Sequence, residues 1–168
     1  MKRRLDIYTL EYGKILLMIA LVFPVIIMSF SSLQANDKAV PAECEVTPSD
    51  ALGPFYKPDA PIRSKVGEGY VLQGGVRSTE DCQPLADAVI EFWMAGPDGK
   101  YTDDYRAQLI SDEEGHYTFE SPVPTPYTSR PPHIHIRVTA DGHQVLVTQH
   151  YPKKDQNTAD FDLVLQPL

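Results

Sequence analysis

Short stretches in which apolar and polar residues alternate recur along the chain from residue 70 onwards. Alternation with a period of two is typical of strands with one buried face, and turn-forming residues separate the stretches. After residue 35, no window keeps the 3.6-residue period of a helix for three turns. The stretches that predict strands are 70–77, 88–94, 107–110, 116–119, 134–138, 144–148 and 161–165. Together they predict an all-β domain, an antiparallel β-sandwich or barrel.

Some of these stretches carry more specific expectations. Stretch 88–94 is almost continuously apolar, so we expect burial on both of its faces. The glycine pair 74–75 predicts a β-bulge inside the first strand. In 134–138, alternation directs the isoleucines to the core and leaves His133 and His135 together on the opposite face. Turns are predicted at 96–99, 112–115 and 141–142.

The first 35 residues differ from the rest of the chain. Basic residues 2–4 are followed by an apolar stretch at 15–30 and then by the sequence SSLQA at 31–35. This order is typical of an export signal, and the apolar stretch is shorter than the roughly 20 residues needed to span a bilayer. An uncleaved membrane anchor is the alternative, and the cleavage position is open. We expect a signal peptide or anchor at 1–35, a linker at 36–46 and a folded domain at 47–168, exported to the periplasm or secreted.

Charge narrows the class of partner. Residues 36–168 hold eleven basic and twenty-one acidic residues, which gives a net charge of −10. A nucleic-acid-binding surface needs clustered lysine and arginine, so this composition argues against such a partner. We therefore expect an acidic domain that meets a membrane only through its N-terminal segment, and a homo-oligomer remains open.

Cys44 and Cys82 are the two cysteines of the chain, and both lie in the part expected to be exported. In an oxidising compartment such a pair is more often a disulfide than two free thiols. Closing this loop of 38 residues would stabilise the fold by roughly 3–4 kcal/mol in the chain-entropy account.

Candidate chemistry is concentrated at 127–135, where a tyrosine, an arginine and two histidines fall close together. Two imidazoles at alternate strand positions can hold one metal ion, and the alternative is a histidine pair with no ligand role. We expect Trp93 to pack beneath this site. Other histidines and tyrosines are expected to be solvated (His116, His143 and His150) or in the sheet core and its rim (Tyr56, Tyr70, Tyr105 and Tyr117).

Several short motifs, in this order, resemble the intradiol ring-cleavage dioxygenases, the family of protocatechuate 3,4-dioxygenases and catechol 1,2-dioxygenases. They are GPFY at 53–56, PLADAVIEFW at 84–93, GKY at 99–101, DEEGHYTF at 112–119, PY followed by RPPHIH at 126–135, and TQHY at 148–151. Each motif is short, but their shared order is specific. The resemblance implies an antiparallel β-sandwich with a metal site built from loops and one strand.

The resemblance further implies that Tyr101, Tyr127, His133 and His135 bind one non-haem Fe(III). Phenolate oxygens favour ferric iron, and imidazoles suit iron as well. In the family's mechanism a catechol binds through both oxygens, displaces Tyr127 and reacts with O2, and the ring opens to a muconate-type diacid. The chain would then be an oxidoreductase of aromatic compound catabolism.

Two further residues receive catalytic roles from the same resemblance. Arg130 stands where the family carries an arginine beside the substrate ring, and a fixed guanidinium there can stabilise negative charge. The alternative is a surface arginine paired with a carboxylate. Gln149 matches a family residue near the oxygen side of the site.

Departures from the family pattern keep other hypotheses open. The stretch between Tyr101 and Tyr127 is shorter than in larger members, and the helical dimerisation region of catechol 1,2-dioxygenases is absent. These departures predict a more open pocket and argue against a catechol-specific cytoplasmic enzyme. The competing hypothesis is an exported, transthyretin-like β-sandwich binding module with a vestigial metal site. Zinc or copper on the same residues is disfavoured, because two tyrosinates suit those metals poorly.

The substrate is left open by the sequence. A net charge of −10 would repel acidic aromatics such as protocatechuate from a distance. A basic residue near the site, such as Lys57, Arg63 or Arg106, could offset that repulsion locally.

Overall fold

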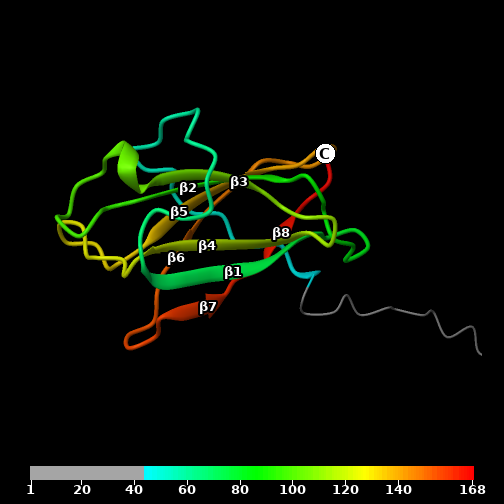
Figure 1. Cartoon of the computed structure of the whole chain (residues 1–168). Helices are drawn as coiled ribbons and strands as arrows, with labels where there is room; N and C mark the ends of the chain where they lie inside the picture. Colours follow the sequence, from blue (N-terminus) through cyan, green and yellow to red (C-terminus); the bar gives the residue numbers. More distant parts are fainter. Residues whose placement is uncertain (1–43) are drawn as a thin grey trace, which may run out of the picture. The chain divides into compact units, whose positions relative to one another are not determined.

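Residues 44–168 form short β-strands joined by loops and turns in the computed structural model (Figure 1). The structure describes this range alone, so the predicted signal or anchor at 1–35 and most of the linker at 36–46 lie outside the described residues. Between residues 44 and 168, no helix is both long and apolar enough to cross a bilayer.

The strands are arranged in two four-stranded sheets. The first sheet contains β4 (His116–Pro122), β1 (Gly69–Ser78), β7 (Thr158–Asp160) and β8 (Leu163–Leu165). The second has the order β3 (Arg106–Ile110), β2 (Val89–Met94), β5 (Ile134–Thr139) and β6 (Leu146–His150), and it is antiparallel throughout. A short 3₁₀ helix, η2 (Asp103–Tyr105), precedes β3.

The predicted β-sandwich is confirmed, and each predicted stretch overlaps a strand. Two details differ from the prediction. Strand β7 was not predicted, because three residues are too few to show an alternating pattern. The first sheet is mixed rather than antiparallel, because the chain returns from β6 and runs beside β1 in the same direction in both β7 and β8.

The prediction of a bulge at the glycine pair 74–75 is wrong. Strand β1 pairs with β4 without interruption from Gly69 to Gly75. The interruption lies on the other side of β1, where β7 and β8 pair with its two halves. Between them the Phe161 carbonyl comes so close to Gly74 that a Cβ atom there would overlap it. The glycine therefore permits the close approach of a neighbouring segment.

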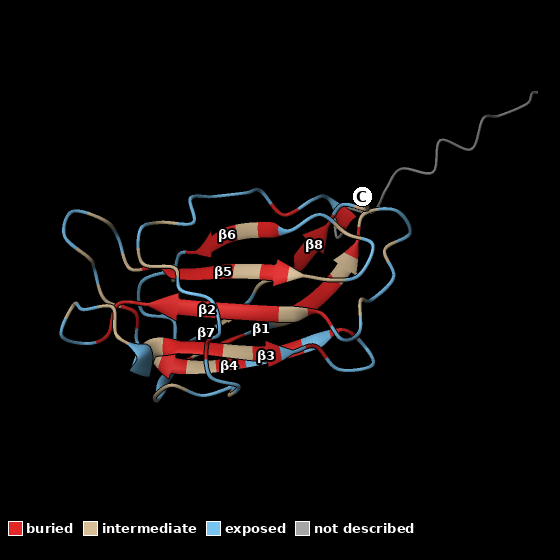
Figure 2. Cartoon of the chain, turned by 90° about the horizontal axis from the view of Figure 1, so that it is seen from above, coloured by how far each residue is buried: buried red, intermediate tan, exposed pale blue. Residues whose placement is uncertain are grey.

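The inner faces of the two sheets meet in one apolar core (Figure 2). Ile134 and Ile136 of β5 are fully buried there, as their alternation predicts. Phe92 of β2 stacks on Phe119 of β4, with ring centroids 4.3 Å apart and planes 4° from parallel. Burial of such side chains supplies most of the stability of a sandwich of this size, at about 1.5–3 kcal/mol for each.

The outer face of the second sheet is also buried where β2 and β5 lie, as predicted for stretch 88–94. Glu91 and Trp93 point to this side, and His135 is the cross-strand neighbour of Trp93. A loop that precedes β1 covers them. Its Tyr56 hydroxyl donates to the Glu91 carboxylate at 3.2 Å, and the Tyr56 ring lies against Trp93. The result is a second buried environment, polar and aromatic, next to the candidate site.

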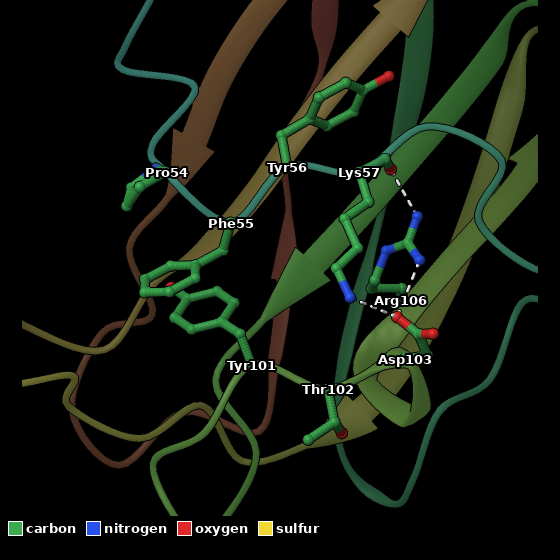
Figure 3. Close-up of a pocket in the computed structure, with 8 residues that line it drawn as sticks. All are labelled: Pro54, Phe55, Tyr56, Lys57, Tyr101, Thr102, Asp103 and Arg106. Atoms are coloured by element: carbon green, nitrogen blue, oxygen red, sulfur yellow. Dashed lines mark hydrogen bonds and ion pairs between the residues drawn. The ribbon is translucent and has the colours of Figure 1, made fainter.

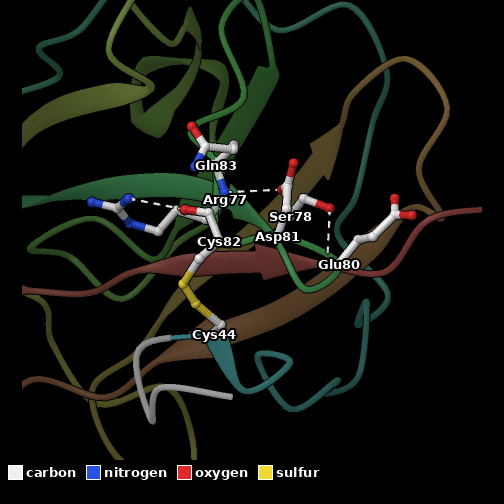
Figure 4. Close-up of a disulfide and its surroundings, with 7 residues drawn as sticks. All are labelled: Cys44, Arg77, Ser78, Glu80, Asp81, Cys82 and Gln83. Carbon is white, nitrogen blue, oxygen red and sulfur yellow. Dashed lines mark hydrogen bonds between the residues drawn. A yellow bond between two sulfur atoms is a disulfide. The ribbon is translucent and has the colours of Figure 1, made fainter. Parts of the chain in front are cut away.

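A disulfide joins Cys44 to Cys82, with Cα atoms 5.4 Å apart (Figure 4). The predicted bridge is confirmed. Three residues after Cys44, the Thr47 N–H donates to the Val164 carbonyl of β8, and the Val164 N–H donates to the Thr47 hydroxyl. The bridge and this pair of hydrogen bonds fix the start of the segment that leads to residues 50–56 at the candidate site.

Candidate metal centre

His133 and His135 lie at the start of β5 with their rings close together. The ring centroids are 4.8 Å apart, and the two side chains are 2% and 1% exposed. Ile134, which stands between them, points into the core, so both histidines face the other way. The prediction that they share one face is confirmed. Two neighbouring, buried imidazoles are well suited to hold one metal ion.

One ring nitrogen of His133 is fixed by the backbone. Its Nδ1 lies 2.7 Å from the Pro131 carbonyl oxygen, which can only accept, so Nδ1 carries the proton and donates. Nε2 then carries the lone pair, which accepts a hydrogen bond from the Tyr101 hydroxyl at 3.0 Å. Burial lowers the pKa of His133, which favours the neutral ring. A neutral imidazole oriented by a backbone carbonyl is the usual form of a histidine metal ligand.

His135 is held in a different way. Burial lowers its pKa to about 4, so the ring is neutral at pH 7. Its buried Nδ1 has no hydrogen-bond partner among residues 44–168. The nearby Ala51 carbonyl opposes this lowering of the pKa, but it makes no hydrogen bond of good geometry with His135 and accepts from Gln149 Nε2 at 2.6 Å. The His135 ring instead stacks on Trp93, with centroids 4.9 Å apart.

Tyr101 reaches the histidine pair from the loop after β2. The predicted turn at 96–99 is present and is closed by a backbone hydrogen bond. The Tyr101 ring stacks on Phe55, with centroids 4.3 Å apart (Figure 3). Burial raises the pKa of Tyr101 to about 12, although the charge of Arg130 opposes the shift. On its own the group is a neutral phenol, and a metal cation beside it would favour the phenolate.

Tyr127 and Arg130 are placed side by side by a tight turn. The N–H of each donates to the carbonyl of the other. Thr128 between them has a φ of 52°, a left-handed conformation that is costly for a β-branched residue. The Tyr127 ring meets Tyr101 edge-on, with centroids 5.2 Å apart. The strained turn thus brings a second phenol beside the first.

The Arg130 guanidinium is held by neutral groups. Its Nη2 donates to Gln149 Oε1 at 2.8 Å and to the Tyr151 hydroxyl at 3.0 Å. Gln149 is buried and is itself held by the Ala51 carbonyl, and the Tyr151 hydroxyl lies 2.8 Å from an Asp50 carboxylate oxygen, to which it donates. The arrangement differs from the alternative of a surface arginine paired directly with a carboxylate. It fixes a positive charge close to the histidines.

Sequence reasoning gave no role to Asp50, Phe55 or Tyr151. Phe55 lies in the GPFY motif and Tyr151 in the TQHY motif, but their contacts depend on how residues 50–56 fold over the second sheet. Asp50 contacts Tyr151, which lies 101 positions away in the chain, and no local pattern marks it.

The prediction that His150 is solvated is wrong. His150 is 8% exposed, and its Nε2 lies 2.7 Å from the Tyr70 hydroxyl. Alternation along β6 places it on the inner face with Leu146, where burial lowers its pKa to about 4. His116 is exposed as predicted, whereas His143 is half-buried and lies 3.0 Å from the Ser78 hydroxyl. The predictions for Trp93 and for the core and rim tyrosines are confirmed (Tyr56, Tyr70, Tyr105 and Tyr117).

The three basic residues that could offset negative charge near the site make hydrogen bonds or ion pairs within the fold. Lys57 Nζ lies 3.3 Å from the Asp103 carboxylate. Arg106 donates to the same carboxylate and to the Lys57 carbonyl (Figure 3). Arg63 donates to the Arg106 carbonyl. A cavity of about 100 Å³ beside Tyr101 is lined by Lys57 and Arg106, and both cations are already paired.

The residues present fit a ferric ion. Tyr101, Tyr127, His133 and His135 come together from two loops and the start of one strand. Two phenols and two neutral imidazoles form a donor set that suits Fe(III), and the unpartnered imidazole of His135 has a lone pair to offer. In the part of the chain that the structure describes, no three histidine, cysteine, aspartate or glutamate side chains gather as a metal group. The phenols are therefore needed to complete the candidate ligand set.

Comparison with known proteins identifies the family of the chain. A family model described as Dioxygenase matches residues 53–166. Hydroxyquinol 1,2-dioxygenase of Rhodococcus opacus is 32% identical over 166 residues, which covers 79% of this chain and 55% of that protein. Chlorocatechol 1,2-dioxygenase of Pseudomonas sp. (strain P51) is 33% identical over 133 residues, which covers 59% of this chain and 53% of that protein. The chain spans about half the length of the curated relatives it matches.

Solved structures agree on the fold. The dioxygenase domain of a dioxygenase–carbohydrate-binding protein fusion from Streptomyces sp. SirexAA-E is 26% identical, with a TM-score of 0.65 over 74% of this chain and 100% of that one. An intradiol ring-cleavage dioxygenase from Tetranychus urticae, 18% identical, gives a TM-score of 0.66 over 74% of this chain and 96% of that one. The family match covers more than half of the sequence, from the loop that carries Phe55 to the last strand. The chain belongs to the intradiol dioxygenase family.

Proposed function

We propose that this protein is a non-haem Fe(III) oxidoreductase that opens a catechol-type ring with O2, between the two hydroxyl-bearing carbons, to give a muconate-type diacid. The observation that carries the proposal is the contact of 3.0 Å between the Tyr101 hydroxyl and His133 Nε2, with His135 and Tyr127 packed around it. The relatives are named as dioxygenases of chlorocatechol and hydroxyquinol, and these names support the substrate class.

We assign the ligand role to Tyr101, Tyr127, His133 and His135. A ferric ion held there would supply Lewis-acid activation of a bound catecholate. The buried imidazoles need no proton to be removed before they bind, because burial lowers the pKa of both histidines. Both phenols are half-buried, but the Tyr101 hydroxyl is held by His133, whereas Tyr127 lies on a short turn. Tyr127 is therefore the phenol we assign to leave and to take up a proton from a substrate hydroxyl.

Arg130 is the residue we assign to the charge that develops on the substrate ring. Its guanidinium is held by Gln149 and Tyr151, so it need not reorganise during the reaction. Gln149 keeps its orientation through its hydrogen bond to the Ala51 carbonyl, and we assign it the role of positioning Arg130 on the oxygen side of the site.

A neutral catechol fits the surroundings better than a carboxylated one. Lys57 and Arg106, the cations nearest the cavity beside Tyr101, are paired with Asp103. This pairing weakens their attraction for a carboxylate, and the net charge of −10 on residues 36–168 repels one. We therefore propose catechol or a neutral substituted catechol as the substrate, ahead of protocatechuate.

We also propose that the domain acts outside the cytoplasm. The disulfide between Cys44 and Cys82 supports this location, because such bridges persist in oxidising compartments. The basic and apolar character of residues 1–35 supports export as well.

Iron content, colour and oxygen incorporation test the proposal. The full chain, purified and loaded with Fe(III), should bind one iron per chain and absorb visible light through tyrosinate-to-iron charge transfer. With catechol under ¹⁸O₂, the product should gain both labelled oxygen atoms. A colourless protein that binds catechol but no iron would instead support the exported binding module.

A further inference from the structure

Trp93 and His135 form a stacked pair on the outer face of the second sheet. Their ring centroids are 4.9 Å apart and their planes are 5° from parallel, and the two residues are direct cross-strand neighbours on β2 and β5. Each ring carries a buried nitrogen without a hydrogen-bond partner among residues 44–168, Nε1 in Trp93 and Nδ1 in His135. Hydrogen bonds to these nitrogens therefore do not set the orientation of the pair.

His133 has an orienting hydrogen bond that His135 lacks. The Nδ1 of His133 donates to the Pro131 carbonyl at 2.7 Å, and this bond fixes both its tautomer and its ring plane. A histidine that is to bind a metal needs such an orienting contact, and for His135 the contact available is the face of the indole.

Gly53 lies next to the Cε1 atom of the His135 ring. This residue has a φ of +75°, and a Cβ atom added to it would lie 2.9 Å from His135 Cε1. Glycine thus lets the backbone of residues 50–56 approach the imidazole. The ring therefore contacts both that backbone and the Trp93 indole.

A polar cluster supports the outer side of Trp93. The Tyr56 ring lies against the indole with centroids 5.1 Å apart, and its hydroxyl donates to both Glu91 carboxylate oxygens at 3.2 Å. Glu91 is 5% exposed and pairs with the Arg137 guanidinium at 2.7 Å, and that guanidinium lies 5.8 Å from the centre of the Tyr56 ring. Glu91 and Arg137 are themselves direct cross-strand neighbours on β2 and β5. The pairs Glu91–Arg137 and Trp93–His135 are therefore neighbours on the outer face, and the first supports the second.

We propose that Trp93 is a positioning residue for His135, and that Tyr56, Glu91 and Arg137 hold Trp93 in place. Stacking takes the role at His135 that the backbone hydrogen bond has at His133. The inference rests on the proposed iron site, because it assigns to Trp93 the orientation of one of the ligands. Trp93 itself touches neither metal nor substrate in this proposal.

Replacement of the indole tests the proposal. Trp93→Leu should weaken Fe(III) binding by about 10–100-fold, the usual loss when the partner that orients a ligand is removed. It should also shift the tyrosinate-to-iron absorption band, which depends on ligand geometry. Trp93→Phe keeps an aromatic face and should recover most of both properties. Affinity is measured by competition with a chelator, and the band by visible absorption.

Phe92→Leu is the matched control, because Phe92 neighbours Trp93 in β2 but packs in the core on the opposite face. This variant should lose stability and keep the iron affinity and absorption band of the parent protein. Equal losses of affinity in Trp93→Leu and Phe92→Leu would overturn the positioning role.

A second readout does not need iron. In the metal-free protein the indole ring current should displace the His135 Cε1–H proton resonance, and Trp93→Leu should remove that displacement while Trp93→Phe keeps part of it. An unchanged resonance in Trp93→Leu would overturn the stack even if that variant bound iron poorly. Parent protein that binds no iron but shows the displaced resonance would contradict the proposed function and leave the stack intact.

Discussion

The two faces of β2 and β5 are both buried, but for different reasons. On the inner face Phe92, Ile134 and Ile136 pack against the other sheet, and hydrophobic burial alone accounts for their position. On the outer face Trp93 and His135 are buried because a loop folds over them. The same strands therefore have one face that stabilises the fold and another that carries the candidate site. Neighbouring residues along each strand point to opposite faces.

This difference determines what each face tolerates. The inner face has apolar groups whose loss leaves a cavity, and the cost appears as reduced stability. The outer face keeps polar atoms that are unpartnered within residues 44–168, such as Nδ1 of His135, and each costs stability in the metal-free protein. We infer that the outer face gives up stability for the ability to bind a ligand.

Removal of a candidate ligand gives the largest expected effect. His135→Ala should abolish iron binding and ring cleavage, because one of the two imidazoles is lost. The same change should lower the free energy of unfolding of the metal-free protein less than a change in the core, because a buried nitrogen without a partner is removed with the ring. Iron content and urea unfolding measure the two effects, and retention of stoichiometric iron would remove His135 from the ligand set.

A core substitution on the same strands should have the opposite profile. Phe92→Ala should cost about 3–5 kcal/mol of unfolding free energy, because the ring is fully buried and stacked on Phe119. The fraction that remains folded should bind iron with the parent affinity. Urea unfolding of the metal-free protein gives the first quantity and chelator competition the second. A loss of affinity that parallels the loss of stability would mean that the two faces are coupled.

Sequence alone predicted the inner face better than the outer one. Alternation identifies Ile134 and Ile136 as core residues, because side chains with a period of two must share a face. The same rule predicts that His133 and His135 share the opposite face. The stack of His135 on Trp93 could not be predicted, because it depends on the pairing register of two strands distant in the chain.

The wrong predictions concern residues whose surroundings are set by contacts with segments distant in the chain. His150 was expected in solvent because it follows a strand end, yet it is buried beside Tyr70 of the other sheet. The glycine pair predicts a bulge, but Gly74 instead accommodates the Phe161 carbonyl between β8 and β7, the strand that the sequence pattern did not predict. The order of the short motifs gave the four candidate ligands, whereas the contacts that hold Arg130 appear only in the folded chain.

The role of Arg130 separates catalysis from metal binding on the outer face. Arg130→Ala should keep the iron, the colour and catechol binding, and it should slow ring opening by about 10²–10³-fold, because a fixed charge next to developing charge is lost. Arg130→Lys should restore only part of the rate, since a point charge does not reproduce the planar guanidinium. Single-turnover kinetics under O2 with catechol already bound measures the step. An unchanged rate would leave Arg130 with a structural role.

The smallest expected effect comes from His150, a buried histidine that lies beside the Tyr70 hydroxyl on the inner face. Burial lowers its pKa to about 4, against about 6.5 in an unfolded chain. Between these values the unfolded chain binds more protons than the folded one, so acid favours unfolding. The stability that depends on the neutral ring is complete above about pH 6.5 and is lost as the pH falls towards 4.

From pH 7 to 5.5 the loss at His150 should be about 1 kcal/mol. His135 titrates in the same direction in the metal-free protein, so the measurement is a difference between two chains. His150→Leu removes the titration together with the hydrogen bond to Tyr70, and the lost bond lowers stability at every pH without changing its slope. Urea midpoints measured across pH 4–7 should therefore fall less steeply towards acid in His150→Leu than in the parent. Identical slopes would mean that His150 titrates normally and that the inner face opens to water at the end of β6.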